Sequence, residues 1–85
     1  MITSYHKDFL KKFKKLNPRQ KSKFKERQII FEKDEFNPIL NNHALTGKYQ
    51  GFRSINISGD LRAIFRREKD SVLFAALDKH SNLYG

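Results

Sequence analysis

The chain ends in LDKHSNLYG, which places His80 and Tyr84 four residues apart near the end of an 85-residue sequence. An imidazole transfers protons near neutral pH, and a phenol ring can stack on a nucleobase. Further charged or polar candidates lie upstream of this tail: His43, Lys48, Arg53, Asp60, Arg62 and Arg66. Together these residue types predict a site that moves protons beside a bound anion.

The same residue types match what RNA cleavage without a metal requires. In that reaction the 2′-OH attacks the adjacent phosphorus, and a general base removes its proton. A cation stabilises the charge that develops, and a general acid protonates the leaving 5′-oxygen. Positioned proton transfer contributes about 10²–10⁴-fold in rate, and an arginine donates to two phosphate oxygens at once. The sequence has no P-loop, GxGxxG or HExxH motif and no cysteine, so we expect neither a cofactor nor a metal.

Three short runs rich in β-branched and aromatic residues predict an antiparallel meander that positions these candidates. The runs cover residues 52–57, 61–67 and 72–77, and SGD and EKDS separate them. Because the last run is antiparallel to the middle one, its end should return to the start of the middle run. We therefore expect His80 and Tyr84 to approach Asp60 and Arg62.

The first hairpin is expected to turn at residues 59 and 60. That turn would place Arg62 opposite Ile57, and Arg66 opposite Arg53. The three arginines would then share one open face of the sheet, where their mutual repulsion is best tolerated if an anion binds.

The first 36 residues predict two basic helices. Apolar residues at 9, 13 and 16 have the spacing of an amphipathic helix. Asn17 and Pro18 then predict a stop and a restart, with Asn17 capping a second helix that begins at Pro18. This helix is expected to run to about Phe36, before Asn37 and Pro38. Its predicted inward residues are Phe24, Ile30 and Phe31.

These elements predict an α+β fold in a single domain over residues 1–85. An N-terminal edge strand, residues 2–5, and a two-helix hairpin would pack on one face of a small, mainly antiparallel sheet. A chain of this length buries about 60% of the surface that its unfolded form exposes. A site on such a domain is therefore expected to be a shallow groove rather than a deep pocket.

The charge balance predicts a polyanionic partner. Lys and Arg number 18 against 9 Asp and Glu, which gives a formal net charge of +9. Nucleic acid, an acidic protein segment and an anionic membrane surface all fit this balance. No segment has the length of a membrane span and none resembles a signal peptide, so a cytoplasmic protein without a membrane partner is expected.

The second half of the sequence resembles the RelE/ParE superfamily of bacterial toxins, which pair with antitoxins in two-gene modules. It is most similar to the YafQ-like branch, through HALTG at residues 43–47, Arg53, Asp60, and the closing HSNLYG at residues 80–85. The segment GDLRAIF also resembles a strand of RelE that carries a catalytic arginine, which places Arg62 at that position.

The resemblance implies an endoribonuclease that cleaves mRNA in the ribosomal A site and is neutralised by an antitoxin with a net acidic binding segment. It implies that His80 and Asp60 form the acid–base pair, that Arg62 stabilises the phosphate and that Tyr84 fills a terminal aromatic position. His43 matches a further histidine of the branch. Lys48, Arg53 and Arg66 are expected to contact RNA.

Three positions depart from the YafQ-like pattern. Asn56 replaces a second histidine, Leu61 replaces a tryptophan and Ala76 replaces an arginine of the last strand. The branch also lacks the arginine found here at position 62. The predicted site is therefore a hybrid of the YafQ-like and RelE patterns.

Other interpretations stay open alongside this one. The same fold can act as a gyrase-inhibiting toxin of the ParE class, or as a catalytically decayed RNA-binding module. Asp60 can be a simple turn residue, and Arg62 can pair with Asp78 or Glu68. The lysine-rich helices can contact ribosomal RNA, bind an antitoxin or only face solvent.

Overall fold

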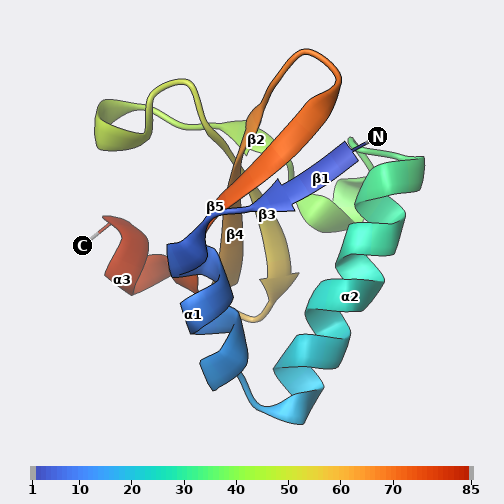
Figure 1. Ribbon diagram of the computed structural model, residues 1–85, viewed down its shortest axis with the longest axis vertical. Helices are drawn as coiled ribbons and strands as arrows, with labels where there is room; N and C mark the ends of the chain where they lie inside the picture. The colour runs from blue at the N-terminus through green and yellow to red at the C-terminus, as the bar shows by residue number, and fades with distance from the viewer. Residues whose placement is uncertain (1, 85) are drawn as a thin grey trace.

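Five strands form one sheet, and two helices cover one of its faces (Figure 1). The computed structural model describes residues 2–84, and of residue 84 only the backbone. The sheet order is β1-β5-β4-β3-β2, in which β1 pairs parallel to β5 and the other pairs are antiparallel. The predicted α+β fold is confirmed. The elements are β1 (Ile2–Tyr5), α1 (Lys7–Lys15), α2 (Pro18–Lys33), η1 (Pro38–Leu40), β2 (His43–Ala44), η2 (Gly47–Tyr49), β3 (Arg53–Ser58), β4 (Leu61–Arg67), β5 (Ser71–Lys79) and α3 (His80–Tyr84).

The boundary between α1 and α2 is set by local hydrogen bonds. The side-chain oxygen of Asn17 accepts from the backbone N–H of Gln20 at 2.8 Å. The side-chain oxygen of Gln20 accepts from the N–H of Asn17 at 3.1 Å. This reciprocal capping box, with Pro18 as the first helical residue, confirms the predicted restart.

Helix α2 ends at Lys33, three residues before the predicted end near Phe36. Asp34 leaves the helical region with φ −152° and ψ 86°, although its N–H still donates to the carbonyl of Ile30 at 2.8 Å. Asn37 caps the short 3-10 turn η1 through a hydrogen bond to the N–H of Ile39, rather than ending α2. Phe36 is consequently 63% exposed.

Aromatic rings form the centre of the core between the helices and the sheet. Phe31 of α2 meets Phe65 of β4 edge to face, with centroids 4.9 Å apart. Phe9 of α1 lies 5.6 Å from Phe74 of β5. Each fully buried ring stabilises the fold by about 1.5–3 kcal/mol relative to exposure. The predicted inward residues Phe24 and Phe31 are buried, whereas Phe13 and Ile30 are partly buried against the core.

A β-bulge changes the predicted register of the β3–β4 hairpin. Ser58 pairs with Leu61, as a turn at residues 59 and 60 requires, but the next pair is Asn56 with Arg62. The extra residue Ile57 is absorbed by the bulge, so the pairing beyond it moves by one residue. The predicted pairing of Arg62 with Ile57 is therefore wrong.

The same shift moves Arg53 to the other face of the sheet. Arg53 pairs with the buried Phe65 instead of Arg66, so its side chain starts on the helix-covered face. There its Nε donates to the side-chain oxygen of Asn42 at 2.7 Å, and its guanidinium lies 5.4 Å from the ring centroid of Phe36. The predicted cluster of three arginines on one open face is corrected to two.

Strand β2 was not predicted, because a two-residue strand has no periodicity to detect. It places His43 opposite Ser54 of β3. Strand β5 begins one residue earlier and ends two residues later than predicted, and this extension brings Asp78 into the sheet. None of the helices within residues 2–84 has the length and apolar character needed to cross a membrane.

Candidate active site

The open face of the sheet, opposite α1 and α2, presents polar residues in register across three strands. Asn56 of β3, Arg62 of β4 and Asp78 of β5 form one row of directly opposed residues. The next row contains Ser54, Ile64 and Ala76, and it continues to His43 on β2. Neighbouring strands lie about 4.8 Å apart and successive same-face residues about 7 Å apart, so the two rows are adjacent. Ser54 and Ile64 are both 0% exposed, so only the first row, Ala76 and His43 reach the surface.

The chain returns from β5 to the β3–β4 turn, as predicted. The backbone N–H of His80 donates to the carbonyl oxygen of Asp60 at 2.8 Å. Asp60 follows Gly59, whose φ of +51° allows the tight turn. His80 begins α3, and the predicted approach of His80 to Asp60 is confirmed at the level of the backbone. The side chain of Tyr84 lies outside the described part of the chain, so its predicted place beside them stays a prediction.

Arg62 is turned toward the hairpin turn. Its Nη1 donates to the carbonyl of Gly59 at 2.8 Å and to that of Leu61 at 3.3 Å. The alternative ion pairs proposed for it are formed by other cations: Asp78 pairs with Lys12, and Glu68 pairs with Arg66. A guanidinium has five N–H donors, so Arg62 keeps donors for an anion at the row that it shares with Asn56.

His43 has one tautomer fixed by its surroundings. Its Nδ1 lies 2.8 Å from the carbonyl oxygen of Asn41. Because a carbonyl only accepts, Nδ1 carries a proton in this contact, and Nε2 is the ring nitrogen left to contact a ligand.

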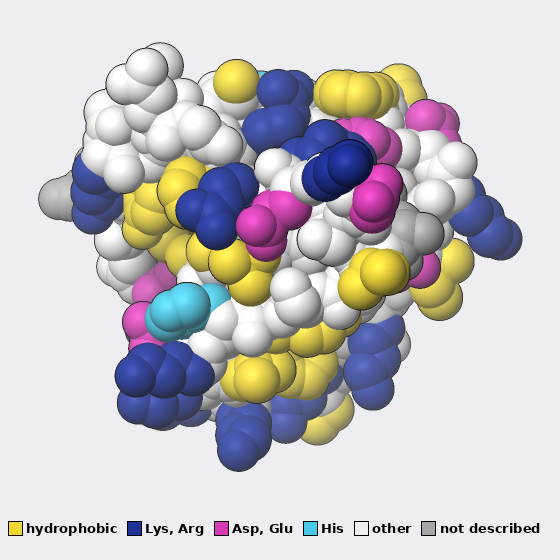
Figure 2. Space-filling view, turned by 45° about the horizontal axis from the view of Figure 1, so that its top comes forward, with side chains coloured by type: hydrophobic (Ala, Val, Ile, Leu, Met, Phe, Trp, Pro, Cys, Tyr) yellow, Lys and Arg dark blue, Asp and Glu magenta, His cyan; other side chains and the backbone are white. Residues whose placement is uncertain are grey.

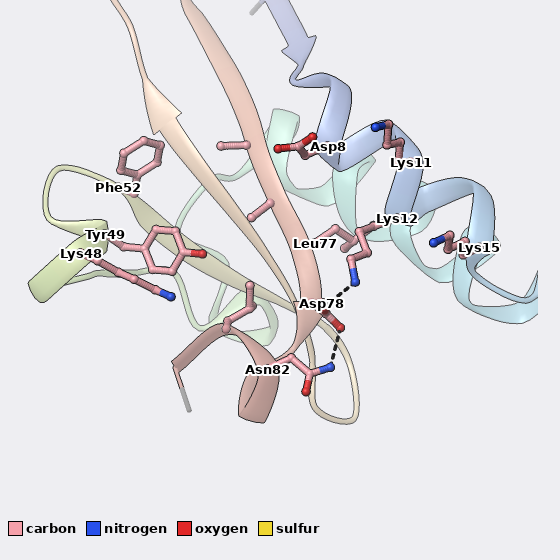
Figure 3. Close-up of a pocket in the computed structure, with 13 residues that line it drawn as sticks. Asp8, Lys11, Lys12, Lys15, Lys48, Tyr49, Phe52, Leu77, Asp78 and Asn82 are labelled. Atoms are coloured by element: carbon pink, nitrogen blue, oxygen red, sulfur yellow. Dashed lines mark hydrogen bonds and ion pairs between the residues drawn. The ribbon is translucent and has the colours of Figure 1, made fainter.

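Asp78 connects β5, α1 and α3 at this end of the sheet, and the sequence analysis did not predict this role. Its Oδ2 lies 3.0 Å from Nζ of Lys12 on α1, and its Oδ1 accepts from the Lys79 N–H at 2.8 Å and from Nδ2 of Asn82 at 3.1 Å. Figure 3 shows both side-chain contacts of Asp78. Partial burial acts to raise the pKa of Asp78, but the hydrogen bonds from Asn82, Lys79 and Lys12 and the charge of Lys12 outweigh it and lower the pKa below 3.8. The carboxylate thus tethers α1 to the start of α3, where His80 lies; we call these contacts the Asp78 clamp. The sequence signal for this clamp was the spacing of four residues between Asp78 and Asn82, which allows their side chains to form a hydrogen bond.

A groove of about 640 Å³ lies beside the second half of β5 (Figure 3). Lysines of α1 line it on one side, and Lys48 with Tyr49 and Phe52 lines it on the other. Its floor contains residues 75–78 of β5, and Asn82 and Leu83 of α3 close one end. Of the predicted site residues whose side chains the structure describes, only Lys48 lines this groove.

Arg66 lies away from the other candidates. It is four residues further along β4 than Arg62, which corresponds to about 13 Å. Its guanidinium lies 5.6 Å from the ring centroid of Phe52 and pairs with Glu68 at 3.7 Å. Arg53 is on the opposite face, so neither of these two arginines joins the surface formed by Asn56, Arg62 and Asp78.

The sequence matches one protein family along its whole length. The profile of the family described as "Bacterial toxin of type II toxin-antitoxin system, YafQ" matches residues 1–85. The chain belongs to the YafQ family. This confirms the resemblance to the RelE/ParE superfamily and to its YafQ-like branch. No sequence among the curated proteins matches the chain.

Solved structures of toxins share the fold. YafQ from E. coli superposes with a TM-score of 0.83 at 18% identity, covering 98% of this chain and 97% of that chain. The E. coli DinJ-YafQ toxin-antitoxin complex gives 0.80 at 20% identity over 98% and 96% of the two chains. A YoeB/ParE toxin from Agrobacterium tumefaciens gives 0.80 at 14% identity over 94% and 99%. At these identities the likeness establishes the fold alone.

The departures from the YafQ-like pattern occupy two different places. Asn56 and Ala76 lie on the open face, in adjacent rows. Leu61 is 4% exposed and belongs to the core on the helix-covered face. Two of the three departures therefore lie on the face that carries the candidate site of this YafQ-family toxin, and the third lies in the core on the other face.

Proposed function

We propose that this YafQ-family toxin is a ribosome-dependent, metal-independent mRNA endoribonuclease that acts in the cytoplasm. The main support for the proposal is the backbone hydrogen bond between His80 and Asp60. It brings an imidazole and a carboxylate to the turn that Arg62 contacts through the carbonyl of Gly59. These are the groups that metal-free phosphodiester cleavage needs, and they converge from the first turn and from the end of the β-meander.

In this mechanism His80 and Asp60 act as the acid–base pair. One removes the proton of the 2′-OH and the other protonates the departing 5′-oxygen, with positioned proton transfer contributing about 10²–10⁴-fold. Arg62 donates N–H groups to the phosphorane oxygens, where charge develops. Tyr84 stacks on a base or orients the 2′-OH, and His43 contacts the RNA from β2. The exposure of His43, Asp60 and His80 suits a polymer that binds across a surface.

The proposed partner is a cognate antitoxin whose binding segment is net acidic. The chain carries a formal net charge of +9. An apolar groove of about 210 Å³ lies between α1 and α2, and its lining includes Phe9, Leu10 and Phe13 together with Lys25. Figure 2 shows hydrophobic side chains exposed between Lys and Arg side chains on one face of the molecule. An amphipathic acidic segment satisfies both the apolar and the cationic parts of this surface.

Growth arrest on induced expression tests the proposed function. We expect the wild type to stop growth and to generate mRNA 5′ ends at codon-phased positions. His80→Ala and Arg62→Ala should lose both effects while staying folded. Arg19→Ala, which changes the same residue type on an exposed position of α2, is the matched control and should behave as wild type.

Arrest that persists in both site variants, or arrest without new 5′ ends, would contradict the proposal. Arrest accompanied by a DNA-damage response would favour the gyrase-inhibiting class instead. RNA binding without arrest would favour a decayed module, for which Asn56 and Ala76 on the open face are the specific structural support.

A further inference from the structure

Lysines from two separate elements flank the groove beside β5. Lys11 and Lys15 belong to α1, whereas Lys48 belongs to η2, more than 30 residues later in the chain. In Figure 3 Lys48 extends from one side of β5 and the α1 lysines from the other. We call Lys11, Lys15 and Lys48 the groove lysines. Cations that converge from distant parts of a sequence concentrate positive potential in one channel.

The groove lysines form no ion pair among the described residues, although Asp8 and Asp78 also line the groove. Lys12 pairs with Asp78, but within residues 2–84 no carboxylate lies at ion-pair distance from Lys11, Lys15 or Lys48. The ammonium group of Lys48 lies 5.3 Å from the ring centroid of Tyr49, a contact that holds it at the rim. An anion in the groove would relieve the repulsion between these charges.

The floor of the groove is the free outer edge of β5. Strand β1 pairs with β5 only from Ser71 to Phe74, and the last contact there is from the N–H of His6 to the carbonyl of Phe74. Beyond that point the chain enters α1, which packs beside β5 without pairing with it as a strand, and residues 75–78 border the groove. The groove is continuous with the open face, because Asp78 lines it and also lies in the row of Arg62.

We propose that this groove binds the phosphodiester backbone of single-stranded RNA next to the linkage that is cleaved, with the groove lysines contacting its phosphates. The inference rests on the proposed function and extends it by placing the RNA path around the edge of β5 and onto α1. Aromatic walls combined with a cationic channel are typical of sequence-tolerant single-strand binding, and Tyr49 and Phe52 supply such a wall.

An acidic peptide strand is the competing occupant, and the shape of the groove disfavours it. The β5 edge carries a register shift between Ile64 and Phe65 of its partner strand, which interrupts regular pairing there. Helix α3 also closes one end, through Asn82 and Leu83. A strand added to this edge would therefore have few residues to pair with, whereas a nucleic acid backbone needs only the charges.

Fluorescence anisotropy with a labelled single-stranded RNA octamer, fully 2′-O-methylated so that it cannot be cleaved, tests the inference apart from catalysis. The variant is Lys11→Gln with Lys48→Gln. The matched control is Lys25→Gln with Lys33→Gln, which removes the same charge from α2, where neither residue lines the groove. All four side chains are exposed, so both proteins should fold.

We expect the groove variant to bind the octamer at least about 10-fold more weakly than the control variant at the same salt concentration. Its slope of log K against log salt should be shallower than that of wild type by about 1.4, because each phosphate contact on a single strand contributes about 0.7. Equal weakening in both variants would mean diffuse electrostatic binding and would overturn the inference.

A ten-residue glutamate peptide supplies the second arm. If the peptide binds wild type as tightly as the octamer and depends on the same lysines, the occupant is an acidic peptide and the inference is wrong. Wild type that binds the octamer through the groove yet never cleaves mRNA would leave the inference standing and contradict the proposed function. Cleavage that is unaffected by loss of the groove lysines would support the proposed function and contradict the inference.

Discussion

The backbone N–H of His80 donates to the carbonyl oxygen of Asp60 at 2.8 Å, so the proposed acid and base are connected through the main chain. Both residues are exposed. A substitution at either position leaves this hydrogen bond available, because no side-chain atom takes part in it. The chemistry of the two side chains can therefore be tested without detaching the tail from the turn.

We expect Asp60→Asn to reduce mRNA cleavage by at least about 100-fold, because it removes a proton-transferring group. The melting temperature should change by less than about 2 °C, since surface substitutions usually alter stability by no more than about 0.5 kcal/mol. Asp70→Asn is the matched control, because Asp70 lies in the other hairpin turn, between β4 and β5. Loss of activity in both variants, or in neither, would show that Asp60 is only a turn residue.

The Asp78 clamp should govern the order of the C-terminal helix. Asp78→Asn keeps the shape but removes the charge that pairs with Lys12 at 3.0 Å. Because Lys12 is half exposed, we expect a loss of only about 1 kcal/mol in the free energy of unfolding. Hydrogen exchange of the amides of residues 79–83 should become faster.

Glu26→Gln serves as the control for this change. It removes a comparable ion pair, with Lys23 on the surface of α2 at 3.6 Å. Amide exchange in the tail should stay at the wild-type rate in this variant. Unchanged exchange in Asp78→Asn would mean that the clamp does not hold α3.

The clamp should also give a defined pH dependence. The folded-state pKa of Asp78 is lowered from 3.8, so its contribution is complete above the unfolded value and is lost as the pH falls through the lower folded value. The stability difference between wild type and Asp78→Asn should therefore be constant from neutral pH to about pH 5 and then vanish in acid. Chemical unfolding measured from pH 7 to pH 3 checks this, and a difference that grows in acid would refute the assignment.

Burial distinguishes two phenylalanines of the α2 region. Phe31 is 0% exposed and contacts Phe65 and Phe74, whereas Phe36 is 63% exposed. We expect Phe31→Leu to lower the free energy of unfolding by about 1–2 kcal/mol and Phe36→Leu by less than about 0.5 kcal/mol. Urea unfolding of both variants provides the measurement, and equal losses would contradict the boundary of α2 at Lys33.

Much of the fold follows from local signals in the sequence. The Asn17–Gln20 capping box and Pro18 determine where α2 begins, and the predicted run 61–67 coincides with β4. Its alternation is interrupted by Ile64, which is fully buried although it lies on the face opposite the helices. The return of His80 to Asp60 follows from antiparallel pairing alone. These features depend on residues close in sequence or on a single turn, which is why they can be predicted.

The site was harder to predict because small irregularities decide which face a side chain occupies. The bulge at Ile57 moves Arg53 to the helix-covered face, and the residue types of that strand do not predict a bulge. The Asp78 clamp and the groove lysines depend on contacts between α1, β5 and η2 that only the three-dimensional arrangement creates. Long-range packing therefore accounts for most of what the sequence did not show.

Asn56 is the position where one substitution should restore activity if the site is incomplete. It lies directly opposite Arg62 on the open face, and its Oδ1 is buried without a hydrogen-bond partner in the part of the chain that the structure describes. The YafQ-like pattern carries a histidine there.

We expect Asn56→His to increase the rate of mRNA cleavage by about 10-fold or more, because it places an imidazole directly opposite Arg62, in addition to that of His80. Cleavage in a purified translation system measures the change. Asn56→Gln, which enlarges the side chain without adding a titratable group, is the matched control and should give no increase. If Asn56→His cleaves no faster than wild type, the His80–Asp60 pair already suffices and Asn56 is not the mark of a decayed site.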